Sequence, residues 1–221
     1  MTKQTVAPSK SEPKVNRSTI LWVIGGVVAL ALIVLMALSI ANEPAIDTSI
    51  GFGEVTAEGN PIPFLAEGGD PTIGFPAPTV SGADWNGVPT TIEADGRPKL
   101  IVFLAHWCPH CQAEVPEVQA WLDAGNLPDD VDIYSVTALT NPTRTNWPPQ
   151  DWLEAEGWTV PVIMDDAEST VATAYGMTGT PFWVVLDGEN NNLGRVSGQV
   201  GVTGLETMVR VAQDSITDSG S

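Results

Sequence analysis

The chain concentrates its reactive side chains in one short stretch, residues 105–116, which reads AHWCPHCQAEVP. Both cysteines of the 221-residue chain, Cys108 and Cys111, and both histidines, His106 and His110, lie in it. Two cysteines separated by two residues can form a disulfide, exchange that disulfide with another thiol, or bind a metal ion. The spacing therefore predicts redox or metal chemistry at this point of the chain.

The residues on either side of the pair predict where the sulfurs lie. An apolar run, KLIVFLA at 99–105, comes before it and suits a strand, whereas the residues after Cys111 suit a helix. Cys108 then lies at a helix N-terminus, where free backbone N–H groups and the helix dipole stabilise a thiolate. We expect Cys108 to be the nucleophile. Cys111, one turn later on the same face, can resolve a mixed disulfide.

Two other uses of the cysteines remain open, and a third is excluded. A structural disulfide closing so small a ring would stabilise the fold by less than about 2 kcal/mol. A zinc site would draw all its cysteine and histidine ligands from six residues, without the long spacer that usually lets a chain wrap around the ion. Cu(I) suits the dithiol better than zinc does. Haem attachment requires a histidine after the second cysteine, and this chain has Gln112 there.

The elements that must position this stretch lie between residues 78 and 212, a length sufficient for one domain with its own core. Apolar and β-branched runs predict strands at 99–105, 131–137, 159–164, 181–187 and 192–198. Helical patterns occupy 108–124, 151–156, 169–175 and 204–211, and 79–81 with 90–93 suits a small hairpin. This order predicts an α/β domain with a mixed central sheet and helices on both faces.

The N-terminal part of the chain predicts a membrane anchor. Residues 18–42 carry no charge, and 19–41 would span about 34 Å as a helix. Lysines and an arginine precede the segment and acidic residues follow it, which favours a cytoplasmic N-terminus and an extracytoplasmic domain. A cleaved signal peptide is the alternative, because Ser39-Ile40-Ala41 resembles a cleavage site, although the apolar run is longer than usual.

The part of the chain after the predicted anchor is strongly acidic. The chain has nine basic and 27 acidic residues; four basic residues and Glu12 precede residue 42, which leaves a formal charge of −21 beyond it. This charge disfavours nucleic acid and anionic lipid surfaces as partners of this part. Residues 42–77 are rich in Gly, Pro and acidic residues and predict a tether. We thus expect a cytoplasmic segment at 1–18, an anchor at 19–41, this tether, the domain at 78–212 and a tail at 213–221.

Taken together, these motifs resemble the thioredoxin superfamily, and within it the membrane-anchored thiol-disulfide oxidoreductases of the TlpA/ResA type. The matching residues are Trp107-Cys108-Pro109-His110-Cys111 after a strand, then Glu114-Val115-Pro116, and later Gly179-Thr180-Pro181-Phe182 opening another strand. The resemblance covers about residues 75–210. It implies a thioredoxin-like fold behind one N-terminal transmembrane helix.

The resemblance also implies roles for further residues. Pro181 would be cis and lie beside the cysteines, where the backbone of Thr180 can pair with an extended substrate, and Trp107 would flank that surface. Glu114 matches a glutamate that moves protons near the sulfurs. Val102 replaces the buried aspartate of thioredoxin itself, so proton transfer falls to Glu114, to water or to another group. His106 is expected to be a partly exposed flanking residue rather than a catalyst.

His110 bears on the direction of the reaction. Pro-His between the cysteines is the dipeptide of the oxidase DsbA, whereas the overall resemblance favours a reductase, so the sequence leaves the direction open. An added donor or charge at His110 would stabilise the Cys108 thiolate and make the protein more oxidising.

The sequence thus predicts an extracytoplasmic, membrane-tethered thiol-disulfide oxidoreductase that requires no cofactor and no metal. Its expected partners are cysteine-containing extracytoplasmic proteins, a redox partner in or outside the membrane, and the lipid bilayer around residues 19–41, with no nucleic acid. A copper-handling module using the same dithiol is one alternative. A peroxiredoxin-like peroxidase is another, although Ala105-His106-Trp107 replaces the Thr-x-x that normally precedes its nucleophile.

Overall fold

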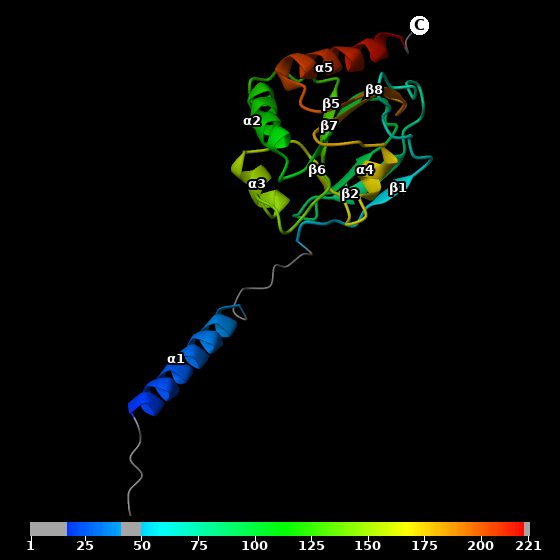
Figure 1. Ribbon diagram of the computed structural model, residues 1–221. Coiled ribbons are helices and arrows are strands. Elements are labelled where there is room, and N and C mark those ends of the chain that lie inside the picture. Colours follow the sequence, from blue (N-terminus) through cyan, green and yellow to red (C-terminus); the bar gives the residue numbers. More distant parts are fainter. Residues whose placement is uncertain (1–16, 41–49, 219–221) are drawn as a thin grey trace, which may run out of the picture. The chain divides into compact units, whose positions relative to one another are not determined.

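The computed structural model describes residues 17–40 and 50–218. Helix α1 (Arg17–Ile40) belongs to one unit of the chain, and all other described elements belong to a second (Figure 1). α1 agrees with the helix expected at 19–41 as far as residue 40, and residues 1–16 of the expected cytoplasmic segment lie outside the described residues. Among the described residues, no helix is found that has both the length and the apolar character to cross a membrane.

A mixed sheet of five strands forms the centre of the second unit, in the order β6-β5-β4-β7-β8. β4 runs parallel to β5, which runs parallel to β6, while β7 is antiparallel to both β4 and β8. All six residues of β4 are buried, and five of them, residues 100–104, form the uninterrupted apolar run that is typical of a central strand. The strands are β4 (Lys99–Leu104), β5 (Asp132–Thr137), β6 (Val162–Met164), β7 (Phe182–Leu186) and β8 (Asn192–Ser197).

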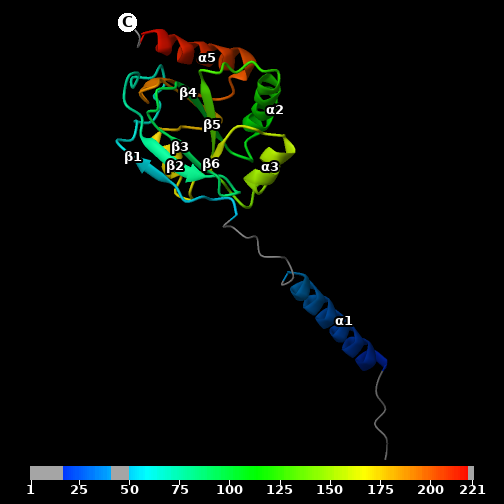
Figure 2. The same ribbon diagram turned by 180° about the vertical axis from the view of Figure 1, so that it is seen from behind.

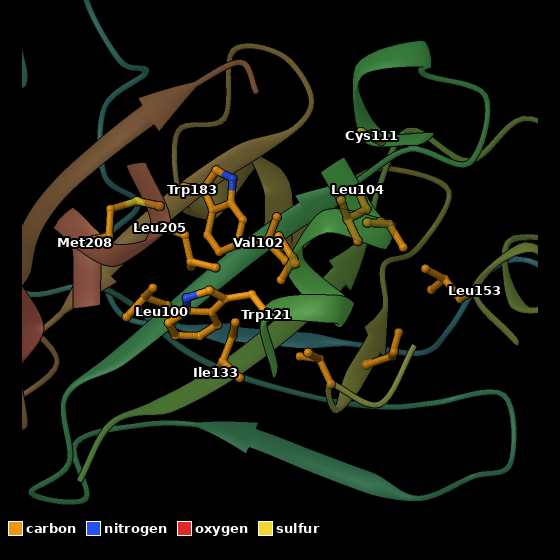
Figure 3. Packing of buried hydrophobic residues seen from close by; sticks show 14 of the residues in the cluster. Leu100, Val102, Leu104, Cys111, Trp121, Ile133, Leu153, Trp183, Leu205 and Met208 are labelled. Atoms are coloured by element: carbon orange, nitrogen blue, oxygen red, sulfur yellow. The ribbon is translucent and has the colours of Figure 1, made fainter. Parts of the chain in front are cut away.

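Helices cover one face of this sheet. They are α2 (Pro109–Asp123), α3 (Pro149–Ala155) and α5 (Gly201–Asp218). The core between these helices and the sheet joins Trp121 of α2, Trp183 of β7 and Leu205 of α5, and Figure 3 shows these side chains directed into one cluster. Cys111 belongs to the same cluster, so the predicted resolving cysteine is part of the hydrophobic core.

The other face carries helix α4 (Thr170–Ala174) and a second, three-stranded antiparallel sheet. That sheet consists of β1 (Thr56–Glu58), β2 (Thr79–Ala83) and β3 (Pro89–Ile92), which lie side by side in Figure 2. β2 and β3 are the hairpin expected from the sequence. The prediction of a mixed sheet with helices on both faces is therefore confirmed.

The structure corrects the predicted tether for residues 50–77, which pack on the domain. Ile62 N–H donates to Ala174 O at 2.8 Å, and β1 adds a strand to the second sheet. Asp70 forms a buried ion pair with Arg195 of β8, at 2.8 Å between Oδ1 and Nη2. Gly and Pro are frequent here because the segment turns repeatedly, and it is held by polar contacts that an apolar pattern does not reveal. Residues 42–49 of the predicted tether are outside the described residues.

The last helix is longer than its sequence pattern suggested. α5 begins at Gly201 and extends to Asp218, so it includes most of the expected tail at 213–221. Leu205, Met208, Val209 and Ala212 are its buried side chains in the core. Their spacing of three to four residues is that of one helix face, and the polar residues after Ala212 continue the helix without adding to the core.

Candidate active site

The sheet brings the two halves of the site together at one end of its strands. β4 ends at Leu104, four residues before Cys108, and β7 begins at Phe182, directly after Pro181. Because the two strands are antiparallel, with Phe103 opposite Phe182, the end of β4 meets the start of β7. The cysteine motif and the Thr180–Pro181 bond therefore lie next to each other, although 72 residues separate Cys108 from Thr180.

Cys108 is the N-cap residue of α2, as the strand-to-helix pattern predicts. Its thiol donates to Thr180 O at 3.2 Å, and its backbone N–H donates to Ala105 O at 3.0 Å. Cys108 is 6% exposed, whereas Cys111 is completely buried, so Cys108 presents the more accessible sulfur. The geometry identifies Cys108 as the sulfur that an incoming disulfide or thiol can reach first.

The surroundings of Cys108 favour its thiolate. Burial alone would raise the pKa of Cys108, but the backbone N–H of Cys111 and the side chain of Thr180 lower it and oppose burial. The Cys111 thiol and the backbone N–H of His110 add further stabilisation, and the pKa of Cys108 falls below its ordinary value. These N–H groups belong to the first turn of α2, which has no intrahelical acceptor for them.

Cys111 has the opposite character. Burial raises the pKa of Cys111 to about 12, and the negative charge on the neighbouring Cys108 contributes in the same direction. Ala105 N–H donates to its sulfur at 3.5 Å. Both cysteines are free thiols in this structure. A thiol that ionises so reluctantly can attack only when a proton acceptor is available, which suits a sulfur that acts second.

The Thr180–Pro181 peptide bond is cis, which confirms that expectation. Thr180 is half-buried and Pro181 buried, and Gly198 N–H donates to Pro181 O at 2.8 Å, which connects this turn to the residue after β8. The carbonyl of Thr180 is directed at Cys108. The structure thus places both residues beside the sulfur, while their pairing with a substrate stays a prediction.

Glu114 lies one turn after Cys111 in α2 and is 1% exposed. Its Oε1 accepts from the N–H groups of Val200 and Gly201, at 2.9 and 3.0 Å, at the start of α5. Its Oε2 has no hydrogen-bond partner among the described residues. Burial raises the pKa of Glu114, although these two N–H donors and the side chain of Trp183 act to lower it. A buried carboxyl with a raised pKa and one unpaired oxygen can accept or release a proton, as the expected role requires.

The two histidines differ from each other. His110 is exposed, and its backbone N–H contributes to the stabilisation of Cys108. His106 is 1% exposed, which corrects the expectation of a partly exposed residue. Its Nδ1–H donates to Thr145 O at 2.7 Å, and its Nε2 accepts from Asn141 N–H at 3.2 Å. Burial lowers the pKa of His106, so the ring is neutral and both nitrogens are engaged.

Residues 139–147, which we call the 139–147 loop, lie between β5 and α3. They contact His106 and Trp107, the two residues before Cys108. Trp107 Nε1–H donates to Leu139 O at 2.8 Å, and the guanidinium carbon of Arg144 lies 5.2 Å from the centroid of the Trp107 ring. The sequence does not reveal this loop as part of the site, because its contacts with His106 and Trp107 span 32 to 40 residues. Its clustered Asn, Pro and Thr residues indicate a turn but do not indicate which residues the loop contacts.

No group of three or more His, Cys, Asp or Glu side chains arranged to hold a metal ion occurs among the described residues. Both ring nitrogens of His106 bind backbone groups, so in this arrangement His106 is not free to act as a zinc ligand.

Residues 72–199, more than half of the chain, match the model of the Redoxin family. The chain is similar to sporulation thiol-disulfide oxidoreductase A of Bacillus subtilis, with 29% identity over 87 residues that make up 39% of this chain and 48% of that protein. Soluble secreted antigen MPT53 of Mycobacterium tuberculosis is 29% identical over 93 residues, 42% of this chain and 40% of that protein. The matches thus span less than half the length of these relatives.

Among solved structures, the thiol:disulfide interchange protein of the thioredoxin family from Chlorobium tepidum has a TM-score of 0.51 and 24% identity to this chain. The alignment covers 62% of this chain and 94% of that one. At this level of identity the likeness establishes the fold alone. The thioredoxin-like fold predicted from the motif residues is therefore confirmed.

Proposed function

Because the chain belongs to the Redoxin family, we propose that it is a thiol-disulfide oxidoreductase that exchanges disulfides with protein cysteines through Cys108 and Cys111. The observation that carries this proposal is the difference between the two sulfurs. The pKa of Cys108 is lowered at the start of α2, whereas that of the buried Cys111 is raised to about 12. One sulfur is thus prepared to attack and the other to resolve, which is the division of labour that disulfide exchange needs.

Trapping of mixed disulfides tests these roles. Cys111→Ser removes the resolving thiol, so a protein substrate should stay bound to Cys108 through a disulfide that reductant releases. The matched control, Cys108→Ser, should trap nothing, because the remaining thiol is buried and fully protonated at neutral pH. Trapping by Cys108→Ser but not by Cys111→Ser would reverse the assignment. Failure of the unsubstituted protein to exchange with glutathione disulfide would contradict the proposed function itself.

We propose that the exchange runs towards oxidation of the partner. The hydrogen bonds to Cys108 stabilise the thiolate, which exists only in the reduced form, so they raise the reduction potential of the Cys108–Cys111 pair. Equilibration with glutathione measures this potential. A value towards that of DsbA, about −120 mV, supports oxidation, and a value at or below that of thioredoxin, about −270 mV, shows a reductase instead.

We also propose that the protein is of the TlpA/ResA type, anchored by residues 19–41 with its domain outside the cytoplasm. The support is the uncharged run at 18–42 and the exposure of the apolar side chains in the described middle of α1, such as Leu30, Ile33 and Met36. The relative MPT53 is named a soluble secreted antigen, which agrees with an extracytoplasmic domain. A thiol reagent that cannot cross membranes should label Cys108 in reduced intact cells; labelling only after lysis would contradict this orientation.

A dithiol that handles copper would have a different signature. Copper bound to the protein as isolated, in proportion to the protein and without disulfide exchange, would favour that alternative over the oxidoreductase.

A further inference from the structure

The 139–147 loop holds one cation against the redox site. Two side chains that precede Cys108 fasten the loop: His106 binds it through both ring nitrogens, and Trp107 donates to Leu139 O. Asn146 Nδ2–H donates in turn to His106 O at 3.2 Å. Within the loop, Arg144 N–H donates to Asn141 O at 3.1 Å and closes a turn. The loop is therefore fixed relative to the cysteine motif, and Arg144 is presented from a defined backbone position.

The Arg144 side chain is exposed and lies over the half-buried ring of Trp107, the residue before Cys108. Guanidinium groups stack on indole rings through a cation–π attraction, which leaves the N–H donors at the edge of the group available. Those donors suit a carboxylate, because the planar fork of arginine can donate two parallel hydrogen bonds to its oxygens.

The remaining cations of the domain are engaged elsewhere. Only five basic residues follow residue 42 in the sequence, and three of them form ion pairs: Arg97 with Asp132, Lys99 with Asp95 and Arg195 with Asp70. Arg144 makes no ion pair with any described residue. Arg210 donates to the Thr207 hydroxyl of its own helix. It lies about 13 Å along α5 from Gly201, the residue whose N–H contacts Glu114 at the site. Arg144 is thus the basic side chain that a substrate at Trp107 would meet.

We propose that Arg144 is a specificity-determining residue that binds a carboxylate next to the reacting cysteine of the substrate polypeptide. The inference rests on the proposed function and names the substrate class within it: proteins whose exchanged cysteine is flanked by Asp or Glu. The acidity of the rest of the domain does not prevent this, because charges farther away than about 8 Å are largely screened at physiological ionic strength. A contact between a guanidinium and a carboxylate acts within that distance.

Peptides with matched sequences test this recognition on the full-length protein. Each peptide carries one disulfide, and the residues beside one cysteine are Glu in the first peptide, Gln in the second and Lys in the third. The quantity measured is kcat/KM for exchange, divided for each variant by its own value with the Gln peptide. We expect the unsubstituted protein to prefer Glu over Gln by about two- to fivefold at low salt, with the preference decreasing as salt is added.

Substitutions of Arg144 separate recognition from a merely structural role. Arg144→Gln should abolish the preference for the Glu peptide, Arg144→Glu should reverse it in favour of Lys, and Arg144→Lys should retain it in part. A residue that only supports Trp107 would change all three rates by the same factor and leave the ratios unaltered. Unaltered ratios in Arg144→Gln and Arg144→Glu would overturn the proposal.

Arg210→Glu is the matched control, because it changes the net charge of the domain by the same amount at a position outside the site. Its ratios should equal those of the unsubstituted protein; if they shift as much as those of Arg144→Glu, the effect is that of the overall field and the proposal is wrong. Exchange with none of the peptides would contradict the proposed function. Equal exchange with all three by the unsubstituted protein would contradict only the inference about Arg144.

Discussion

At the scale of single residues, the chemistry of the site depends on which groups contact the Cys108 sulfur. Its lowered pKa arises from N–H donors of the first helical turn, from the side chain of Thr180 and from the Cys111 thiol, all acting against burial. Such contacts stabilise the thiolate far more than the neutral disulfide. Each group removed should therefore change the pKa of Cys108 and the reduction potential together.

His110 offers a test in which backbone and side chain are separated. His110→Pro removes both the N–H that faces Cys108 and the imidazole, at a helix position where proline is tolerated, whereas His110→Ala removes only the imidazole. A hydrogen bond to a charged group contributes about 1.5–3 kcal/mol, so His110→Pro should lower the potential by about 30–60 mV and raise the pKa of Cys108. Thiolate absorbance and equilibration with glutathione measure the two shifts.

The alanine variant decides which group of His110 acts. If the N–H is responsible, His110→Ala should shift the potential by less than half as much as His110→Pro. Equal shifts would assign the effect to the imidazole, as the Pro-His dipeptide suggested, and no shift in either variant would remove His110 from the redox chemistry.

Glu114 should act on the resolving step. Cys111, with a pKa of about 12, needs a proton acceptor before it can attack the mixed disulfide, and Glu114 lies one turn away on the same helix. Glu114→Gln retains an oxygen for the N–H groups of Val200 and Gly201 but cannot take a proton. We expect release of the mixed disulfide to slow by at least about tenfold, since general acid–base groups contribute about 10²–10⁴-fold and water replaces them in part.

The control for Glu114 uses the Cys111→Ser background, in which only the first attack occurs. There, Glu114→Gln should leave the rate of mixed-disulfide formation unchanged. A slower first step in that background would mean that the carboxylate acts on Cys108 or on the structure of α2. Stopped-flow tryptophan fluorescence as a function of pH resolves the two steps.

At the scale of secondary-structure elements, the sequence predicted what depends on local pattern. The continuous apolar run of β4 and the helix-forming residues after Cys111 placed the sulfurs correctly. The packing of residues 50–77 was not predictable in this way, because Asp70 recognises Arg195 across 125 residues. His106 is another such case: it is buried because backbone groups 35 to 40 residues away satisfy its polar atoms.

The Asp70–Arg195 pair should be the strongest single attachment of the 50–77 segment. The Arg195 side chain is completely buried and that of Asp70 is 5% exposed, and Arg195 donates to Asp70 through both Nε and Nη2. Asp70→Ala leaves a buried guanidinium without its counter-charge, which costs about 3–5 kcal/mol. Urea unfolding should show this loss.

The double variant Asp70→Leu, Arg195→Met removes both charges and should recover most of the lost free energy of unfolding. No recovery would show that the neighbouring hydrogen bonds, not the charge pair, attach the segment.

The same pair predicts how stability changes with pH. Burial opposes ionisation of Asp70, but Arg195, Thr72 and Asn192 lower its pKa below the ordinary value of 3.8. An acid with a lowered pKa in the folded state stabilises the fold above its unfolded-state pKa and loses that contribution as the pH falls below about 4. Asp70→Ala should therefore reduce the dependence of the unfolding free energy on pH below pH 4. An unaltered dependence would assign the acid sensitivity to other carboxylates.

At the scale of the whole molecule, the acidity of the part beyond residue 42 is the dominant property. Its formal charge is −21, and three of its five cations already form ion pairs, so mutual repulsion of carboxylates opposes folding. Added NaCl shortens the screening length from about 30 Å at 0.01 M to about 8 Å at 0.15 M. The melting temperature should therefore rise with salt at pH 7, by about 2–4 °C for each 1 kcal/mol of repulsion removed.

Glu206→Lys, at an exposed position on α5, relieves the same repulsion without salt. This variant should melt at a higher temperature than the unsubstituted protein at low salt and respond less to NaCl, and a melting temperature independent of salt in both proteins would show that the acidic surface does not limit stability.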